Sequence, residues 1–239
     1  MASPLSGLLA ARVRQAPWLD WLLPPRCGGC RALGDWLCEP CRRRIRRLEE
    51  PLCPRCGREL EFATPNCGCR RRLHALRRAR AAAAYEGPLE KALHRFKYEG
   101  WRWLAPALAG LIADRLAVEG VPAAIVLSVP LHQRRQHRRG YNQSELLAEQ
   151  LRRRFELDGH PGWLVRVRDT PPQVGLDRLR REANVSGAFA WRGPQLRLRP
   201  VLLVDDVATT CATLEACAQA LRQGGCGPVH GLTVARVSV

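Results

Sequence analysis

From about residue 80 onward, the hydrophobic and polar positions follow the spacings of strands and helices in turn. Short apolar runs bounded by turn residues predict buried strands at 123–130, 162–167, 199–210 and 228–237. Apolar residues three and four positions apart predict helices at 81–100, 101–120, 142–157 and 212–225. Strands that alternate with helices form a parallel sheet with helices on both faces. We therefore predict an α/β domain over residues 80–239, with ligands at the carboxyl ends of its strands.

Before residue 80, closely spaced cysteines replace this periodicity. Two thiolates held a few residues apart by a turn can bind one Zn²⁺, and two such knuckles complete a tetrahedral site. Four pairs occur here: Cys27 with Cys30, Cys38 with Cys41, Cys53 with Cys56, and Cys67 with Cys69. They predict a double zinc-ribbon module over residues 20–75 that holds one or two structural zinc ions. Sequential pairing is the simplest arrangement, and a crossed pairing of the first and third knuckles remains open.

The compartment bears on how these cysteines are interpreted. The first 25 residues lack the continuous apolar core of a secretory signal, because arginines, prolines and Asp20 interrupt them. No run reaches the roughly 18 apolar residues that a transmembrane helix needs. We expect a cytoplasmic protein without a transmembrane segment. A reducing compartment favours zinc over the alternatives, which are disulfides or free buried thiols.

The formal net charge of +17 favours polyanionic partners. Lys91 and Lys97 are the only lysines, so an arginine-rich coding bias explains the excess as well as phosphate binding does. One basic run carries candidate nucleic-acid contacts, which would form a ridge on a helix: Arg42, Arg43, Arg46 and Arg47. A second basic run lies at 69–80, and a solvated helix face is the alternative for either. Aromatic residues near basic segments are candidates for base stacking: Trp36, Tyr98, Trp101, Trp103 and Tyr141.

An acidic pair stands at the carboxyl end of one predicted strand. Asp205 and Asp206 follow the apolar residues 201–204 and precede a threonine-rich turn into a helix. The backbone N–H groups of a helix N-terminus, together with threonine hydroxyls, can bind a phosphate. Adjacent carboxylates can accept hydrogen bonds from sugar hydroxyls, directly or through Mg²⁺. The segment therefore predicts a site for a phosphorylated sugar.

This segment resembles the phosphoribosyl pyrophosphate loop of type I phosphoribosyltransferases. The resemblance implies that Asp205 and Asp206 bind the ribose hydroxyls and that the turn binds the 5′-phosphate through Ala208, Thr209, Thr210, Ala212 and Thr213. The chain departs from the family pattern at Cys211, where glycine is usual. We interpret Cys211 as a small inert residue, and a thiol activated by the helix N-terminus is the alternative.

We expect a cationic loop before the predicted helix at 142–157. It holds four arginines and two histidines between residues 132 and 139, a concentration of charge suited to neutralising a departing pyrophosphate. We expect Arg138, Arg139 and Asn142 to contact substrate. The alternatives are a solvated basic loop and, for Asn142, a helix cap.

Five segments, taken in order, resemble the ComF family of bacterial proteins: the cysteine pairs, FKYEG (96–100), RRGYNQSELLA (138–148), TPPQVGLDRLRREANVSGAF (170–189) and DDVATT (205–210). The resemblance spans about residues 20–237. It implies a zinc ribbon joined to a type I phosphoribosyltransferase-like domain and a role in natural competence. The implied partners are incoming single-stranded DNA, phosphoribosyl pyrophosphate and a competence helicase.

The same resemblance implies further polar site residues: Lys97, Arg139, Gln173, Arg181 (or its neighbour Arg180) and Asn184. Two functions follow. We favour a protein of DNA uptake that handles single-stranded DNA and binds phosphoribosyl pyrophosphate with Mg²⁺. The alternative is an active Mg²⁺-dependent phosphoribosyltransferase with an unidentified nitrogen nucleophile. In such an enzyme Asp205 and Asp206 would hold the ribose, while Arg139, Lys97 and Mg²⁺ would stabilise the leaving pyrophosphate.

Overall fold

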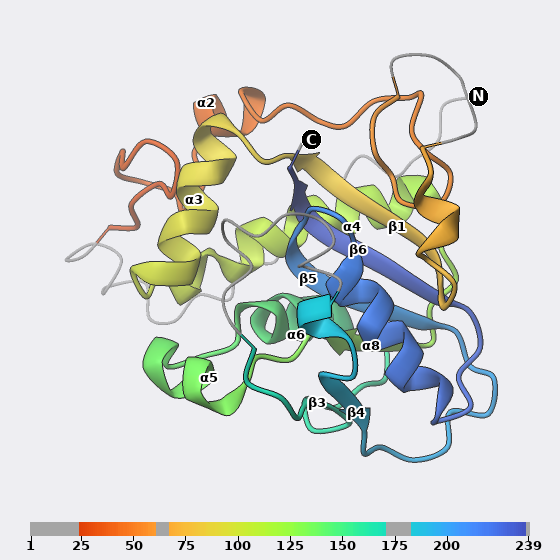
Figure 1. Ribbon diagram of the computed structural model, residues 1–239. Helices are drawn as coiled ribbons and strands as arrows, with labels where there is room; N and C mark the ends of the chain where they lie inside the picture. Colours follow the sequence, from red (N-terminus) through yellow and green to blue (C-terminus); the bar gives the residue numbers. More distant parts are fainter. Residues whose placement is uncertain (1–23, 61–66, 171–182, 238–239) are drawn as a thin grey trace.

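A four-stranded parallel sheet forms the centre of the computed structural model, which describes residues 24–60, 67–170 and 183–237. The strand order is β1-β6-β5-β2 (Figure 1). The strands are β1 (Leu76–Ala84), β2 (Ile125–Ser128), β5 (Val201–Ala208) and β6 (Val229–Arg236). β5 and β6 occupy the middle, where both faces are covered, and every residue of β6 is buried. The predicted α/β class is confirmed.

Helices cover both faces of the sheet. α4 (Ala105–Glu119) and α6 (Gln143–Phe155) pack on one face, and α8 (Ala212–Arg222) packs on the other (Figure 1). The remaining elements are α2 (Glu39–Arg43), α3 (Gly87–Tyr98), α5 (Gln133–Arg139), β3 (Leu164–Arg166), β4 (Phe189–Trp191) and 3₁₀ turns at Cys69–Arg71 and Arg102–Leu104. Among these described segments, no helix is both long enough and apolar enough to cross a membrane.

Each face of the sheet has its own apolar core, and each core contains one group of cysteines. We call Cys27, Cys30, Cys38 and Cys41 the first cluster, and Cys53, Cys56, Cys67 and Cys69 the second cluster. Buried members of the first cluster lie in the core formed with α3, α4 and α6. Buried members of the second cluster lie in the core formed with α8. The two clusters therefore complete opposite faces of one sheet.

The segment between the clusters and the turn from Cys53 to Cys56 cover the outer edge of β1. The carbonyl of Arg46 accepts a hydrogen bond from Ala84 N–H at 2.9 Å, and the carbonyl of Arg55 accepts one from Ala79 N–H at 2.7 Å. These bonds satisfy backbone groups that an edge strand would otherwise expose. The division into residues 20–75 and 80–239 stays a prediction, and these contacts cross it.

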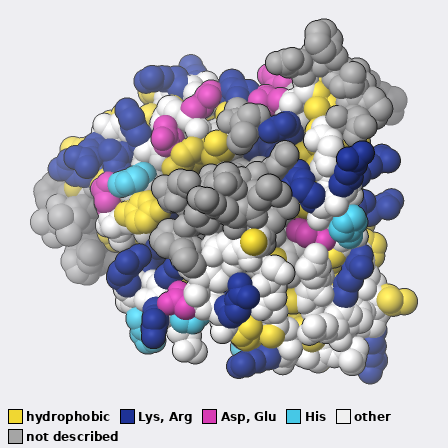
Figure 2. Space-filling view, viewed as in Figure 1, with side chains coloured by type: hydrophobic (Ala, Val, Ile, Leu, Met, Phe, Trp, Pro, Cys, Tyr) yellow, Lys and Arg dark blue, Asp and Glu magenta, His cyan; other side chains and the backbone are white. Residues whose placement is uncertain are grey.

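The arginines expected to form a ridge do not share a helix, because α2 ends at Arg43. All four are engaged within the protein: Arg42 with the Leu37 carbonyl, Arg43 with Glu39, Arg46 with Glu59 and Glu86, and Arg47 with Asp114. Figure 2 shows the same mixing on one face, where basic side chains form several separate groups with acidic side chains between them. The charge of this region is thus partly offset internally.

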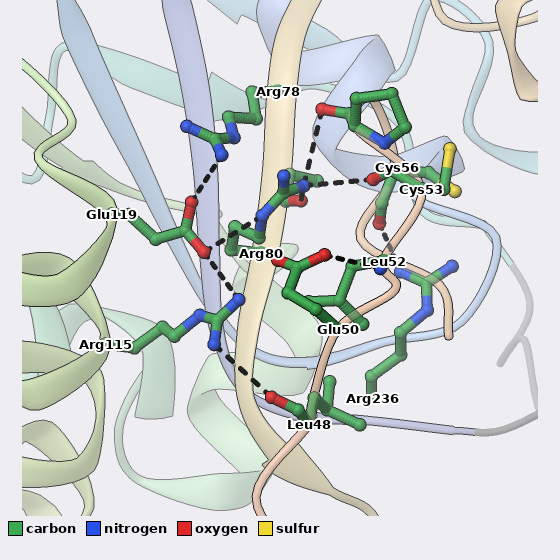
Figure 3. A network of polar contacts seen from close by, with 12 residues as sticks. Leu48, Glu50, Leu52, Cys53, Cys56, Arg78, Arg80, Arg115, Glu119 and Arg236 are labelled. Carbon is green, nitrogen blue, oxygen red and sulfur yellow. Dashed lines mark hydrogen bonds and ion pairs between the residues drawn. The ribbon is translucent and has the colours of Figure 1, made fainter. Parts of the chain in front are cut away.

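A buried ion network joins α4, β1 and the second cluster (Figure 3). The Glu119 carboxylate lies 2.7 Å from the Arg78 guanidinium, 3.0 Å from that of Arg80 and 2.5 Å from that of Arg115. Arg80 Nη1 also donates to the carbonyl of Cys53 at 3.1 Å. Because Arg80 is buried, Glu119 supplies the charge that allows a guanidinium to remain there.

Three predicted segments differ from the structure. Residues 81–84, expected to begin a helix, form the end of β1, and α3 begins only at Gly87. Alanine favours helices, but the backbone of these residues pairs with β6, and Ala81 and Ala84 are buried in one apolar cluster with Leu48 and Leu52, so tertiary packing overrides propensity. The predicted strand at 162–167 exists as β3, yet it pairs antiparallel with β4 outside the main sheet. The cationic segment at 133–139, expected as a loop, is helix α5.

Glu119→Gln should lower the free energy of unfolding by about 3–5 kcal/mol, because it removes the charge that compensates a buried guanidinium. Urea unfolding of the zinc-loaded protein measures this loss. Glu149→Gln is the matched control, since it breaks an exposed pair with Arg153 that is worth about 0.2–1 kcal/mol. Equal losses in the two variants would show that the network does not stabilise the fold.

Candidate functional site

The two acids of β5 meet side chains from two helices near the carboxyl end of the sheet. Lys97 Nζ, on α3, lies 3.1 Å from Asp206 Oδ2. Ser144 Oγ, on α6, donates a hydrogen bond to Asp205 Oδ1 at 2.7 Å, and the N–H of Asp206 donates to the same oxygen at 2.9 Å. Both acids lie within β5, which continues to Ala208, rather than after its end. The structure thus brings Lys97, Asp205 and Asp206 together.

Among the charged side chains of this site, Asp205 has a carboxyl with a strongly raised pKa. Burial and the neighbouring Asp206 raise the pKa of Asp205 to about 7, although the Ser144 hydroxyl and Lys97 act in the opposite direction. Burial opposes the charge of Lys97, but Asp206 and Asp205 outweigh it and raise the pKa of Lys97. Lys97 therefore stays cationic at neutral pH, while Asp205 is close to its titration midpoint. A cation or hydrogen-bond donor that approaches Asp205 would favour its ionised form.

The turn between β5 and α8, residues 208–213, leads directly into the N-terminus of a helix. Cys211 adopts a left-handed backbone with φ 64° and immediately precedes α8. Thr210 Oγ1 accepts a hydrogen bond from Ala212 N–H at 3.3 Å. A left-handed residue before a helix N-terminus directs backbone N–H groups toward one side, where an anion can bind. This β5–α8 turn carries the predicted phosphate ligands: Ala208, Thr209, Thr210, Ala212 and Thr213.

The side chain of Cys211 faces the second cluster. It is buried, and its Sγ accepts a hydrogen bond from Arg236 Nη1 at 3.4 Å. The same Nη1 donates to the carbonyl of Cys56 at 2.7 Å. Cys211 therefore forms a packing contact, in agreement with its interpretation as an inert residue.

Residues of the segment 132–144 contact one another and also more distant parts of the chain. Asn142 caps α6, because its Oδ1 accepts from Ser144 N–H at 3.1 Å while its Nδ2 donates to the carbonyl of Val129 at 3.1 Å. Arg139 hydrogen-bonds the Gln143 side chain, and its guanidinium carbon lies 5.3 Å from the Tyr98 ring centroid. Arg139 thus reaches the C-terminal end of α3, which also carries Lys97. Arg138 is exposed on α5.

The predicted residues of the segment 170–189 are only partly described. Gln173 and Arg181 lie outside the described residues. The carbonyl of Asn184 accepts a hydrogen bond from Arg168 at 3.2 Å. These three residues stay predictions as substrate contacts.

Both cysteine clusters have the donor set and size of a tetrahedral zinc site. Within each cluster the four Sγ atoms lie within 4.8 Å of one another. Zn–S bonds of about 2.3 Å place tetrahedral sulfurs about 3.8 Å apart, close to 3.6 Å between Cys30 and Cys38 and 3.5 Å between Cys56 and Cys67. The pairing is sequential, so the crossed arrangement is not adopted. Four thiolates leave no open position for water, which makes these structural zinc sites.

The surroundings of the cysteine thiols favour a bound cation. Burial opposes ionisation of Cys27, but hydrogen bonds from the backbone N–H groups of Cys30, Cys38 and Gly29 outweigh it and lower its pKa to about 6. Burial and the neighbouring sulfurs raise the pKa of Cys41 in the same cluster, and of Cys69 in the second. The protein alone thus favours one thiolate in the first cluster, and a bound dication would allow the others to ionise.

Aromatic side chains gather around the end of α3 and the following turn. The Trp103 ring lies 5.5 Å from Trp36 and 6.2 Å from Trp101, between ring centroids, and the Arg95 guanidinium lies over Trp101. Tyr98 is 60% exposed and Trp103 44%. We call Trp36, Tyr98, Trp101 and Trp103 the aromatic surface.

Two contributors to the site carried little or no signal in the sequence. Ser144 has the local pattern of a helix cap, and nothing nearby shows that it bonds Asp205. Arg236 lies in an apolar strand of an arginine-rich chain. Its register opposite Ala208 exists only in the folded sheet.

Comparison with known proteins gives one domain match and several relatives. The Double zinc ribbon domain matches residues 18–75. Competence protein F of Haemophilus influenzae is 34% identical over 224 residues, which cover 88% of this chain and 96% of that protein. DNA utilization protein YhgH of Escherichia coli is 35% identical over 219 residues, with 87% and 95% covered. Competence protein ComFC of Bacillus subtilis is 28% identical over 153 residues, with 63% and 60% covered.

Among solved structures, a hypoxanthine phosphoribosyl transferase of Trypanosoma cruzi aligns with a TM-score of 0.32 and 17% identity. The alignment covers 57% of this chain and 64% of that one.

The raised pKa of Asp205 predicts a pH-dependent stability difference. In the unfolded chain Asp205 ionises near the ordinary value of 3.8, whereas in the folded protein it holds its proton up to about pH 7. Its contribution to stability is therefore lost as the pH rises from about 4 to 7. Asp205→Asn mimics the protonated form, so its stability relative to the wild type should rise across that window. Thermal unfolding at saturating zinc measures the difference, and a difference that does not change with pH would contradict this assignment.

Proposed function

The chain belongs to the ComF family, and from this membership and the geometry around β5 we propose that it serves in DNA uptake and binds phosphoribosyl pyrophosphate with Mg²⁺. Its relatives are named for competence and for DNA utilization. The observation that carries the ligand site is the contact of Lys97 with Asp206, and of Ser144 with Asp205, beside the left-handed β5–α8 turn.

In this proposal each part of the ligand meets a group of matching chemistry. The N–H groups of the β5–α8 turn donate to the 5′-phosphate. Asp205 and Asp206 accept hydrogen bonds from the ribose hydroxyls, and Mg²⁺ neutralises the charge of the pyrophosphate. Lys97 offsets the charge of the acid pair, and Arg139 supplies further positive charge at the end of α3. Binding of the ligand requires no transfer of phosphoribose. The transferase alternative is therefore tested separately, by measuring whether pyrophosphate is released in the presence of a nitrogen nucleophile.

Isothermal calorimetry with phosphoribosyl pyrophosphate and Mg²⁺ tests this site. We expect the wild type to bind, and the double variant Asp205→Asn, Asp206→Asn to bind at least about tenfold more weakly, because charge-assisted hydrogen bonds are lost. Asp158→Asn is the control, since Asp158 is exposed and pairs with Arg199. Absence of binding by the wild type would rule out the ligand site.

For single-stranded DNA we propose the aromatic surface as the contact region. Bases stack on exposed aromatic rings, and nearby arginines attract the phosphates. Tyr98 and Trp103 are exposed. The Arg139 guanidinium lies over the Tyr98 ring and that of Arg95 over the Trp101 ring. Arg102 stands between Trp101 and Trp103 in the sequence. Arg42, Arg43, Arg46 and Arg47 are the competing region, but their ion pairs and hydrogen bonds leave less charge for a strand to neutralise.

Fluorescence anisotropy with a labelled thymidine oligonucleotide separates the two regions. Tyr98→Ala combined with Trp103→Ala should weaken binding by about fivefold or more, because each stacked base contributes about 1–3 kcal/mol. Phe155→Ala is the matched control, since Phe155 is also an exposed ring beside an arginine but lies at the end of α6. If instead neutralising Arg42, Arg43, Arg46 and Arg47 flattens the salt dependence while the aromatic variant binds normally, the basic region is the contact.

A further inference from the structure

The backbone at Cys211 is strained for a residue with a side chain. Its φ of 64° and ψ of 12° lie in the left-handed region, which glycine adopts freely and other residues rarely do. Such a conformation persists only where surrounding contacts stabilise it. Here those contacts come from the Cys211 side chain, which is 3% exposed and lies against Arg236 and the Cys56 carbonyl.

A single guanidinium nitrogen joins the β5–α8 turn to the second cluster. Arg236 ends β6 and stands opposite Ala208, the last residue of β5. Its Nη1 donates to Cys56 O at 2.7 Å and to Cys211 Sγ at 3.4 Å, and Cys211 Sγ lies 3.8 Å from Cys56 O. Cys56 is itself one of the four sulfur donors of the second cluster. The side chains of Arg236 and Cys211 therefore join a zinc-ligand residue to the candidate phosphate site.

The Cys56 carbonyl lies at the end of the turn between Cys53 and Cys56, two of the four sulfur donors of the second cluster. Zinc bound to Cys53 and Cys56 fixes the tight turn between them, because both sulfurs must reach one ion. Without the ion, the crowded thiols have no common partner to hold that turn closed. Movement of the turn would displace the carbonyl that Arg236 binds, and with it the contact that stabilises Cys211.

We propose that zinc in the second cluster holds the β5–α8 turn in its anion-binding conformation through Arg236 and Cys211. The part of this proposal that concerns a ligand rests on the proposed binding of phosphoribosyl pyrophosphate. Zinc in the second cluster and the 5′-phosphate on the turn then stabilise each other by the same factor, because coupling between two sites is reciprocal. The first cluster lies in the core of the opposite face and serves as an internal reference.

Zinc release to a zinc-selective chelator measures the coupling in the full-length protein. With phosphoribosyl pyrophosphate and Mg²⁺ present, one of the two zinc ions should leave about tenfold more slowly, within the range of typical couplings, and the other should leave at an unchanged rate. In Arg236→Met the ligand should no longer slow release. Arg80→Met is the matched control, because Arg80 also binds a carbonyl of this knuckle, that of Cys53, but belongs to the network around Glu119. In Arg80→Met, zinc should leave the second cluster faster than in the wild type, but the ligand should still slow its release.

A second measurement requires no ligand. Amide hydrogen exchange of residues 209–213 should be about tenfold faster in zinc-loaded Cys211→Ala than in the wild type, because the strained turn loses its sulfur contact. Cys217→Ala is the control for removing a buried thiol from the same core, and it should leave exchange in the turn unchanged. Cys211→Ala removes one atom and is expected to fold even if Arg236→Met does not.

The outcomes separate this coupling from the proposed function. If calorimetry shows ligand binding but the ligand slows the release of neither zinc ion, the coupling is overturned and the ligand site stands. If the wild type binds no ligand, the proposed function fails and hydrogen exchange decides the coupling. Exchange of residues 209–213 that is the same in Cys211→Ala as in the wild type would then overturn it.

Discussion

Strand β1 is the edge of a parallel sheet, and such a sheet is stable only when its faces and edges are covered. The chain meets this constraint with its cysteine-rich segment. Arg46, between the clusters, and Arg55, within the second cluster, bond the outer edge of β1 at Ala84 and Ala79. The clusters then fall on opposite faces, each within one apolar core. Zinc therefore does more than close two small loops, because each tetrahedron fixes a loop that completes a core of the α/β domain.

Covering the edge in this way brings charges into the interior. Arg80 and Arg236, from neighbouring strands, donate to carbonyls of the same knuckle, at Cys53 and Cys56. The Cys53 carbonyl also accepts a hydrogen bond from Gly57 N–H at 2.9 Å, so Arg80 adds a second bond there, and Arg236 supplies a donor to the buried Cys56 carbonyl. The Arg80 charge is compensated by Glu119, whereas Arg236 reaches the sulfur of Cys211. The packing at this edge thus places the Arg236 guanidinium beside the turn for which we propose phosphate binding.

Regular periodicity made β2, β5, β6, α4, α6 and α8 predictable, since each buries a contiguous apolar face. β1 was misread because LRRARAAAA has neither strand alternation nor β-branched residues, and its strand character comes from its neighbours. β4 has three residues and little local signal. The ridge of Arg42, Arg43, Arg46 and Arg47 required a helix longer than α2, and the carboxylates that pair with Arg46 and Arg47 come from distant parts of the chain.

The sequence by itself determined the chemistry that depends on local spacing. Cysteines two or three positions apart can share a metal ion in any fold, and Asp205 and Asp206 followed by a threonine-rich turn place acids beside a helix N-terminus. Only the tertiary structure decided which distant groups meet them. Lys97 and Ser144 reach the acids because α3 and α6 pack beside β5, and Cys56, Arg236 and Cys211 meet because the second cluster closes the α8 face. Such contacts depend on how whole elements pack, which no local pattern records.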